Sequence, residues 1–299
     1  MKRVICTGLA VLDHIFYLSE IPKKPIKSFA TSYQIVGGGN AATSAVAITR
    51  AGGQAIFWGS LGDDLNGDII LSELKEFGVD VEDVKRLNGL NSSVSTVLID
   101  NMGERLITNY TDSKLLKKVD WLPLDKLAKS DAVLADLRWQ EGALKTLQRS
   151  RELGIPGVLD ADLTPAVLNE EVIKNATHVL FSEPALNEFS KGKSIEEALH
   201  WVSEINRGWV GVTEGSSGTR WLDNGKLKHV PAFNVETVDT LGAGDIFHGV
   251  FALSLAEGHF ENNALIRASA AAALGCSRFG GRKKIPLRKE IETLISQRK

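Results

Sequence analysis

The stretch Ala132-Val133-Leu134-Ala135-Asp136 is a short apolar run that ends in a polar residue. The same pattern returns in Gly157-Val158-Leu159-Asp160, in Val179-Leu180-Phe181-Ser182-Glu183 and in Val210-Gly211-Val212-Thr213-Glu214. A stretch of helical character separates each run from the next. Near-continuous apolar strands that alternate with helices are typical of a parallel sheet covered on both faces. The pattern therefore predicts an α/β protein built as a three-layer sandwich around a mostly parallel central sheet.

Polar side chains follow all four of these predicted strands, where each strand ends. They include Asp136, Arg138, Asp160 and Asp162. In open parallel sheets, ligands bind outside the carboxyl ends of the strands. After any single strand such a residue commonly begins a solvated loop, but four successive polar ends favour a shared crevice.

The first third of the chain has a different pattern. Residues 13–36 and 92–112 alternate in polarity like half-buried strands, with a turn signal at 101–103. Helical stretches lie between them at residues 41–51 and 67–77. We expect the two alternating segments to form a small β-sheet lid on a single domain that spans residues 1–299.

Composition excludes several classes of protein. The 299 residues include 35 basic and 37 acidic side chains, a formal net charge of −2, and 43% are hydrophobic. A charge so close to neutral argues against nucleic-acid or membrane-surface partners, which require a strong field of one sign. The only cysteines, Cys6 and Cys276, exclude a disulfide framework and favour a reducing, cytoplasmic location. No apolar run approaches the ~20 residues that span a bilayer.

A glycine-rich segment, Asp239-Thr240-Leu241-Gly242-Ala243-Gly244-Asp245, directly precedes a long apolar helical stretch at 246–256. Glycines at the start of a helix let backbone N–H groups approach an anion. Asp245 falls in the first turn, where the helix dipole favours a carboxylate that can accept a proton. The pair of features fits phosphoryl transfer to a hydroxyl, although an ordinary helix cap with a tight turn explains the same residues.

A second glycine segment, Gly37-Gly38-Gly39-Asn40-Ala41-Ala42, opens the helical stretch at 41–51. It can be fitted to the dinucleotide pattern G-x-G-x-x-A, with Asp63 at a suitable distance. The residues before it alternate in polarity, however, and no βαβ unit surrounds it. We therefore favour a turn in which Gly38 and Gly39 touch a polyhydroxylated ligand.

The glycine segment at 37–53 and the D-T-x-G-A-G-D segment at 239–245 resemble the two signature motifs of the PfkB (ribokinase-like) carbohydrate kinases, in the same order and separation. The resemblance implies a ribokinase-like fold and ATP-dependent phosphorylation of a sugar hydroxyl. It implies that Asp245 is the base and that Gly242, Ala243 and Gly244 form the anion hole. It also implies that Asp13 contacts sugar hydroxyls, that Mg²⁺ bridges the phosphates, and that ATP lies along Thr213, Gly215 and Gly218.

The sequence departs from this family at two places. Ala42 stands where family members usually carry a substrate-binding asparagine. The N-x-x-E element linked to magnesium is reduced to Phe181-Ser182-Glu183-Pro184-Ala185, which leaves Glu183 as the candidate metal ligand. A requirement for K⁺, known in some relatives, is left open.

Within the family, the stretches at 103–110, 133–139 and 158–165 resemble bacterial 6-deoxy-6-sulfofructose kinases. The positions that recognise the sulfonate in that group correspond to Lys27, Asn109 and Arg138. An ammonium, an amide and a planar guanidinium suit a permanent anion with three acceptor oxygens. The resemblance thus implies phosphorylation of the 1-hydroxyl of 6-deoxy-6-sulfofructose in sulfoquinovose breakdown, by a homodimer that pairs through its lids.

Two alternatives stay open. A fructokinase, a 6-phosphofructokinase or a 2-keto-3-deoxygluconate kinase of the same family would share both motifs. A non-catalytic sugar or nucleotide sensor on a kinase scaffold is compatible with the reduced N-x-x-E element.

Overall fold

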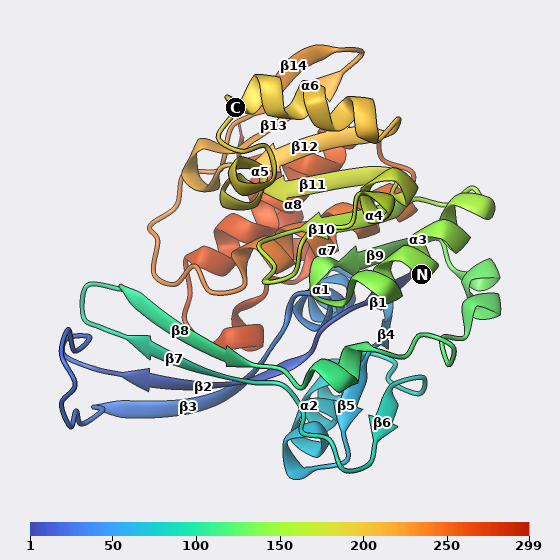
Figure 1. Cartoon of the computed structure of the whole chain (residues 1–299). Helices are drawn as coiled ribbons and strands as arrows, with labels where there is room; N and C mark the ends of the chain where they lie inside the picture. Colours follow the sequence, from blue (N-terminus) through green and yellow to red (C-terminus); the bar gives the residue numbers. More distant parts are fainter. Residues whose placement is uncertain (299) are drawn as a thin grey trace.

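The computed structural model describes residues 1–298 and contains a central eight-stranded sheet in the order β14-β13-β12-β11-β10-β9-β1-β4 (Figure 1). Neighbouring strands from β4 to β12 pair in parallel, whereas β13 and β14 are antiparallel additions at one edge. The mostly parallel central sheet predicted from the apolar runs is confirmed. Its strands are β1 (Arg3–Thr7), β4 (Gln54–Trp58), β9 (Ala132–Asp136), β10 (Gly157–Ala161), β11 (His178–Ser182), β12 (Trp209–Thr213), β13 (Thr219–Asp223) and β14 (Lys226–Val230).

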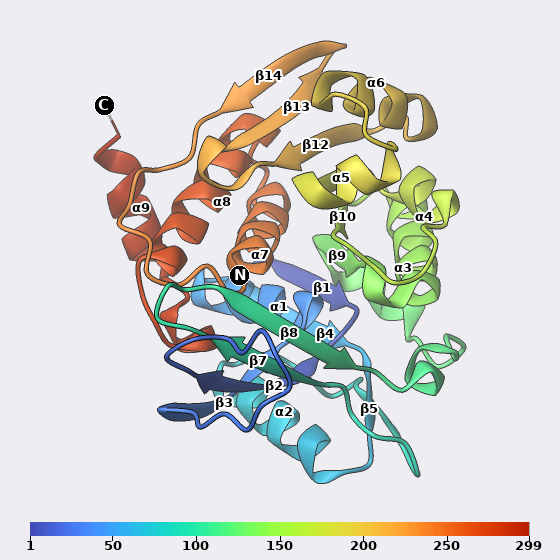
Figure 2. The same cartoon turned by 60° about the vertical axis from the view of Figure 1, so that its left-hand side comes forward.

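Helices cover both faces of this sheet (Figure 2). Successive side chains of a strand point to opposite faces, so Leu134 of β9 joins one apolar cluster and Val133 joins the other. Within residues 1–298, no helix has the length and apolar character needed to cross a bilayer. One face is covered by α3 (Gln140–Glu152), α4 (Glu170–Asn175), α5 (Glu183–Phe189) and α6 (Ile195–Ile205), and the other by α1 (Asn40–Arg50), α7 (Ala243–Ala256) and α8 (Glu261–Cys276), with α9 (Arg288–Ser296) packed on α8.

The chain beyond β4 forms shorter elements at the side of the main body. Helix α2 (Leu65–Glu76) packs there beside a two-stranded sheet of β5 (Ser60–Gly62) and β6 (Lys85–Leu87). Single 3-10 turns complete the connections: η1 (Ser113–Leu116), η2 (Leu124–Lys129), η3 (Leu137–Trp139), η4 (Gly215–Ser217) and η5 (Gly281–Lys284).

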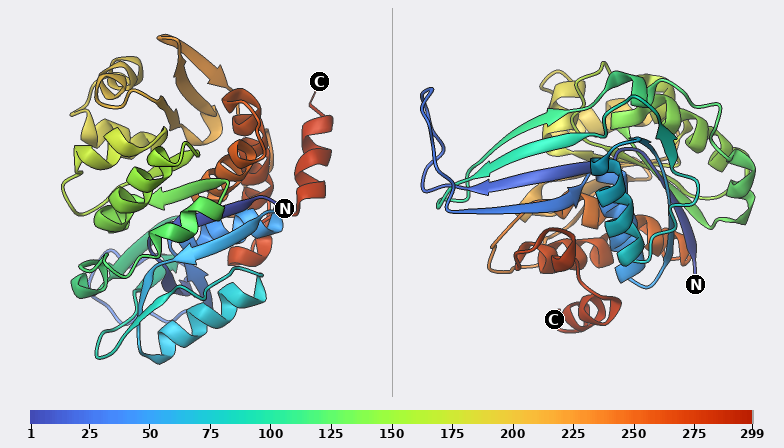
Figure 3. Two further views of the ribbon diagram at one scale, coloured as in Figure 1. Left: turned by 90° about the vertical axis from the view of Figure 1, so that its right-hand side faces the viewer. Right: turned by 90° about the horizontal axis from the view of Figure 1, so that it is seen from below.

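A separate four-stranded sheet projects from the main body (Figure 3). The strand order in this sheet is β3-β2-β7-β8. The strands are β2 (Val11–Tyr17), β3 (Ser32–Gly38), β7 (Val94–Ile99) and β8 (Arg105–Tyr110). The two segments pair through β2 and β7, which run in parallel. The small sheet expected from the two alternating stretches is therefore present.

One buried carboxylate connects the two sheets. Asp136, at the end of β9, is 1% exposed. Its Oδ2 accepts hydrogen bonds from the backbone N–H of Leu9 (2.8 Å) and of Ala41 (3.0 Å), and its Oδ1 accepts one from the N–H of Arg138 (3.0 Å). Burial raises the pKa of Asp136 to about 6 against the opposing effect of these N–H donors. The turn after β1, the start of α1 and the turn after β9 thus share one acceptor.

We expect Asp136→Ala to lower the free energy of unfolding by about 3 kcal/mol, because three N–H groups lose their acceptor inside the fold. Urea denaturation at neutral pH measures this effect. The matched control is Asp120→Ala at an exposed position, which should change stability by less than about 0.5 kcal/mol. Equal stability of the two variants would contradict the role of Asp136.

Candidate active site

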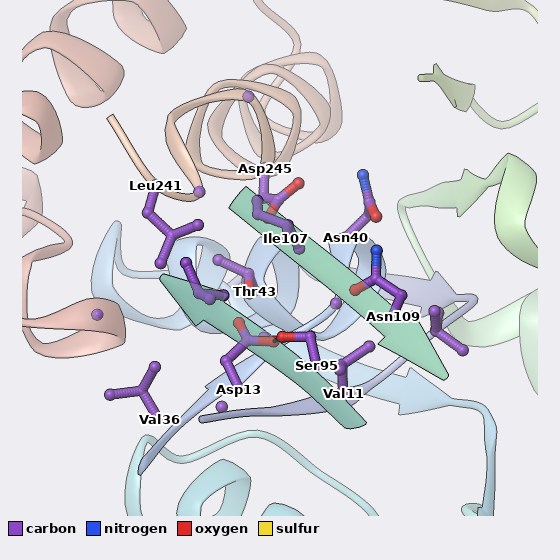
Figure 4. A pocket seen from close by; sticks show the side chains of 18 of the residues that line it. Val11, Asp13, Val36, Asn40, Thr43, Ser95, Ile107, Asn109, Leu241 and Asp245 are labelled. Carbon is purple, nitrogen blue, oxygen red and sulfur yellow. Dashed lines mark hydrogen bonds between the residues drawn. The ribbon is translucent and has the colours of Figure 1, made fainter. Parts of the chain in front are cut away.

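The first cavity lies between the small sheet and the carboxyl ends of the central strands, and has a volume of about 360 Å³ (Figure 4). Side chains from segments far apart in the chain converge on it. The small sheet provides one wall, the glycine segment before α1 a second, and the start of α7 a third. Its polar lining includes Asp13, Asn40, Thr43, Ser95, Asn109, Arg138, Asp162, Thr240, Asp245 and Arg282.

The second cavity, of about 630 Å³, runs along the ends of β12 and β13 towards α8. Thr213, Gly215 and Gly218 line one side of it, and Ala272 of α8 lines another. The two cavities share the lining residues Thr240, Ala243 and Gly244. A ligand group in one cavity can therefore reach a ligand in the other at the start of α7.

The start of α7 has the features of an anion-binding turn, although the N–H of Ala243 donates to the carbonyl oxygen of Thr240 at 3.2 Å. Gly242 occupies the N-cap with φ of 73°, in the left-handed region that favours glycine, and no side chain caps the helix. The unpaired N–H groups of a first helical turn, together with the helix dipole, attract negative charge. Helix α7 itself is buried from Ile246 to Ala256, which fixes this end rigidly between the sheet, α1 and α8.

Asp245 projects from this first turn toward the first cavity (Figure 4). Burial raises its pKa well above the usual range of an aspartate, and the negative charges of Asp160, Asp162 and Asp136 raise it further. The positive charge of Arg282 opposes this effect. A carboxylate with a raised pKa is a better proton acceptor, so the site can remove a proton from a hydroxyl held in the cavity.

Asp13 lies on the opposite side of the same cavity, on β2 (Figure 4). Ser95 of β7 donates a hydrogen bond to its Oδ1. Burial raises the pKa of Asp13, and the Ser95 hydrogen bond and the charge of Arg282 counteract the rise. A Cβ atom at Gly38 would lie 2.1 Å from Oδ2 of Asp13, so only glycine leaves room for this carboxylate.

Arg282 supports this wall from behind. Its guanidinium is 2% exposed, and Nη1 lies 2.9 Å from Oε2 of Glu73. Nη2 donates to the carbonyl oxygen of Gly38 at 2.8 Å. The arginine thus ties the glycine turn to α2, and its positive charge acts on the carboxylates of both Asp13 and Asp245.

The structure brings most of the predicted site residues together. Asp13, Gly38, Gly39, Asn109, Arg138, Gly242, Ala243, Gly244 and Asp245 line the first cavity, and Thr213, Gly215 and Gly218 line the second. Ala42, at the position of the family's asparagine, is fully buried in the apolar core.

Two predicted residues lie elsewhere. Lys27 is exposed in the connection between β2 and β3, where its Nζ sits 5.7 Å from the centre of the Phe29 ring, so the structure does not bring it to the first cavity. Glu183 is exposed at the start of α5 and lines neither cavity.

Several polar residues of the first cavity are not among the predicted site residues. Asn40 and Thr43 follow the quoted glycines directly, and their position at a helix start was an available signal. Ser95 is one of several polar residues in an alternating strand. Arg282 follows Gly280 and Gly281, a segment that can border the active site but whose spacing alone does not place it there.

This chain is similar to known carbohydrate kinases in sequence and in structure. The model of the pfkB family of carbohydrate kinases matches residues 1–288. A ribokinase of Bacillus subtilis is 30% identical over 99% of this chain and 100% of its own. The structure of a provisionally assigned ribokinase of Agrobacterium tumefaciens superposes with a TM-score of 0.95 at 39% identity, covering 99% of this chain and 98% of that one. Arabidopsis thaliana ribokinase complexed with ribose and ATP has the same fold, with a TM-score of 0.83 at 22% identity, covering 98% of each chain.

Proposed function

The chain belongs to the pfkB family of carbohydrate kinases and is an ATP-dependent sugar kinase, and from this premise we propose that it phosphorylates the 1-hydroxyl of 6-deoxy-6-sulfofructose. The observation that carries the proposal is the guanidinium of Arg138 in the first cavity. Arg138 lines the first cavity together with Asn109, Asp13 and Asp245. Within residues 1–298, its guanidinium has no hydrogen-bond or ion-pair partner, although its backbone N–H is bonded to Asp136.

In this proposal the two substrates occupy the two cavities. ATP lies in the second cavity along Thr213, Gly215 and Gly218, with its terminal phosphate at the start of α7. The sugar lies in the first cavity, with hydroxyls on Asp13, Gly38 and Gly39. The shared lining at Ala243 and Gly244 is the point where the phosphate and the accepting hydroxyl meet.

Asp245 then acts as the general base. Its carboxylate takes the proton of the 1-hydroxyl as the oxygen attacks the terminal phosphorus, and ADP leaves. The backbone N–H groups at Gly242, Ala243 and Gly244 stabilise the charge on the phosphoryl oxygens. The rise in the pKa of Asp245 suits it to this step.

Mg²⁺ belongs to this proposal as a companion of the nucleotide. Among residues 1–298, no cluster of three histidine, cysteine or acidic side chains is placed to hold a metal ion. Mg²⁺ keeps waters and phosphate oxygens as ligands and needs only one or two protein carboxylates, which fits this site. Glu183, at the carboxyl end of β11, lines neither cavity, so in this proposal it would reach the ion only through bound water. When bound, the ion neutralises charge on the phosphates.

The sulfonate sits on Arg138 and Asn109. A planar guanidinium can bind two oxygens of a sulfonate, and the amide of Asn109 can donate to the third. Lys27 would join them only after the connection between β2 and β3 folds over the cavity. A neutral hydroxymethyl group would leave the guanidinium without an anion, which is the basis of discrimination.

Ribose is the competing acceptor, because a relative at 30% identity is a ribokinase. Ribose and fructose carry no anion. Fructose 6-phosphate carries one at the same end as sulfofructose and is the nearest charged competitor. The response of each substrate to the loss of Arg138 separates these cases.

The protein is further proposed to form a homodimer through its small sheet. Alternation along paired strands places Asp13, Ser95 and Asn109 on the face that lines the first cavity. Tyr33, Ile35, Leu106 and Tyr110 fall on the opposite face by the same register, and each is 44–50% exposed. A second copy of this face would cover the exposed apolar side chains.

Asp245→Asn should reduce kcat by about 10²- to 10⁴-fold while ATP binding is retained, because the amide cannot accept the proton. Steady-state kinetics and calorimetric titration with ATP measure the two effects, with Asp120→Asn as a surface control. In the wild type, protonation of Asp245 abolishes its function, and its raised pKa moves the acid limb of kcat/KM above the ordinary aspartate value of about 3.9. Activity that stays constant down to pH 4 would contradict this assignment, and a wild type without turnover would favour a sensor.

Arg138→Ala should lower kcat/KM for sulfofructose by about 10- to 100-fold, which corresponds to the loss of charge-assisted hydrogen bonds. Activity on fructose and ribose should change little, because neither sugar carries the anion. The matched control is Arg149→Ala, which removes an arginine from the surface of α3. If wild-type kcat/KM is highest for ribose and is insensitive to Arg138, the sulfonate proposal is wrong and a ribokinase is favoured.

For the dimer, sedimentation equilibrium should give twice the chain mass of 32.4 kDa. Leu106→Arg should shift the protein toward the monomer, since the new charge lies on the proposed interface. Val167→Arg, at a position 95% exposed outside the small sheet, is the control. A wild type that sediments as a monomer would refute the homodimer.

A further inference from the structure

His248 is a buried histidine of α7 that the proposed reaction does not use. It is 3% exposed and lies one helical turn after Gly244. Its Nδ1 is 2.8 Å from the carbonyl oxygen of Gly244, and its Nε2 is 3.3 Å from the carbonyl oxygen of Leu180 on β11. Both neighbours can only accept hydrogen bonds. A neutral imidazole has a single N–H, so both contacts are satisfied only when the ring is an imidazolium.

A buried carboxylate provides the matching negative charge. Oδ1 of Asp160 lies 3.5 Å from Nδ1 of His248, and Asp160 is 1% exposed at the end of β10. Its Oδ2 receives one long hydrogen bond of 3.4 Å from Asn40. Among residues 1–298, no hydrogen-bond donor reaches Oδ1. An unpaired carboxylate at such a depth is very costly, because burial raises the pKa of Asp160, and a positive charge on His248 would oppose that rise.

Other charged groups surround this pair. Asp162 on the loop after β10 and Asp245 on α7 add negative charge, and Arg138 on η3 adds positive charge. Negative groups thus outnumber the positive one when His248 is neutral. A positive charge on His248 would reduce this excess of negative charge without removing it.

The contact with Gly244 connects His248 to the anion site. The carbonyl of Gly244 belongs to the same peptide group as the N–H of Asp245, in the first turn of α7. A charged donor on a carbonyl polarises the peptide and strengthens its N–H as a donor. The contact with Leu180 at the same time holds this turn against β11.

We propose that Asp160 and His248 form a buried ion pair whose imidazolium positions and polarises the Gly244–Asp245 peptide at the start of α7. His248 is a positioning residue, because it touches neither substrate. The inference rests on the proposed role of α7 in phosphoryl transfer. The N–H of Asp245 stands in the same first turn as the N–H groups assigned above to the phosphoryl oxygens. The pair should therefore favour the transition state, in which negative charge lies beside this turn, and should leave ground-state binding unchanged.

The first test is the protonation state of His248 in the full-length wild type. A long-range ¹H–¹⁵N correlation spectrum at pH 7.5 should show two protonated ring nitrogens, assigned by their loss in His248→Asn. His200, which is exposed, serves as the reference ring in the same spectrum. A neutral His248 in an active enzyme would overturn the inference and leave the proposed function intact.

The second test separates positioning from a purely structural role. His248→Asn keeps one side-chain N–H donor but loses the charge, and we expect kcat to fall about tenfold with both KM values within twofold. Asp160→Asn should remove the imidazolium signature and lower kcat to a similar extent. The double variant should then be no worse than either single variant, because the two residues act as one unit.

The outcomes are distinguishable from those of the proposed function. A rise in KM at constant kcat, or additive losses in the double variant, would contradict the positioning role. If a variant does not fold, the wild-type spectrum still decides whether the ion pair exists. An imidazolium in a protein without sugar kinase activity would keep the ion pair and refute the proposed reaction.

Discussion

The first cavity depends on the hydrogen bonds that converge on the carboxylate of Asp136. This carboxylate accepts from the N–H of Leu9, Ala41 and Arg138. Leu9 leads into the strand that carries Asp13, and Ala41 follows the glycine turn that contains Gly38. Each of these three segments would otherwise bury an unsatisfied N–H group. One side chain at the end of a central strand therefore sets the relative positions of the residues that we propose to bind the sugar.

This arrangement concentrates negative charge at the carboxyl edge of the sheet. In addition to burial, the negative charge of Asp160 raises the pKa of Asp136, and the charges of Asp160, Asp162 and Asp136 raise that of Asp245. Arg282 and the dipole of α7 oppose the effect, and His248 would add to that opposition. Because burial and the neighbouring carboxylates outweigh Arg282 and the helix dipole, Asp245 is a stronger base than a surface aspartate. A base of this kind next to a bound phosphate is what hydroxyl activation requires.

The small sheet combines two surfaces in one element. Because side chains alternate along a strand, one face carries Asp13, Ser95 and Asn109 into the first cavity, and the other presents an exposed apolar surface. The pairing of β2 with β7 joins two segments that lie far apart in the chain. A shift of one residue in that register would exchange the two faces and remove Asp13 from the site. The proposed sugar contacts and the proposed pairing of subunits thus depend on the same register.

The sequence by itself determined the central sheet, the small sheet and the start of α7, because these depend on local patterns. Apolar runs reveal buried parallel strands, alternation reveals half-buried ones, and glycines before an apolar helix reveal an anion-facing turn. Only the tertiary structure decided that Ser95 and Arg282 support Asp13, that Lys27 and Glu183 lie outside both cavities, and that Asp160 faces His248. These relations join residues from different elements. Local periodicity predicts which side chains share one face of a helix or strand. The packing of the elements determines which residues that face contacts.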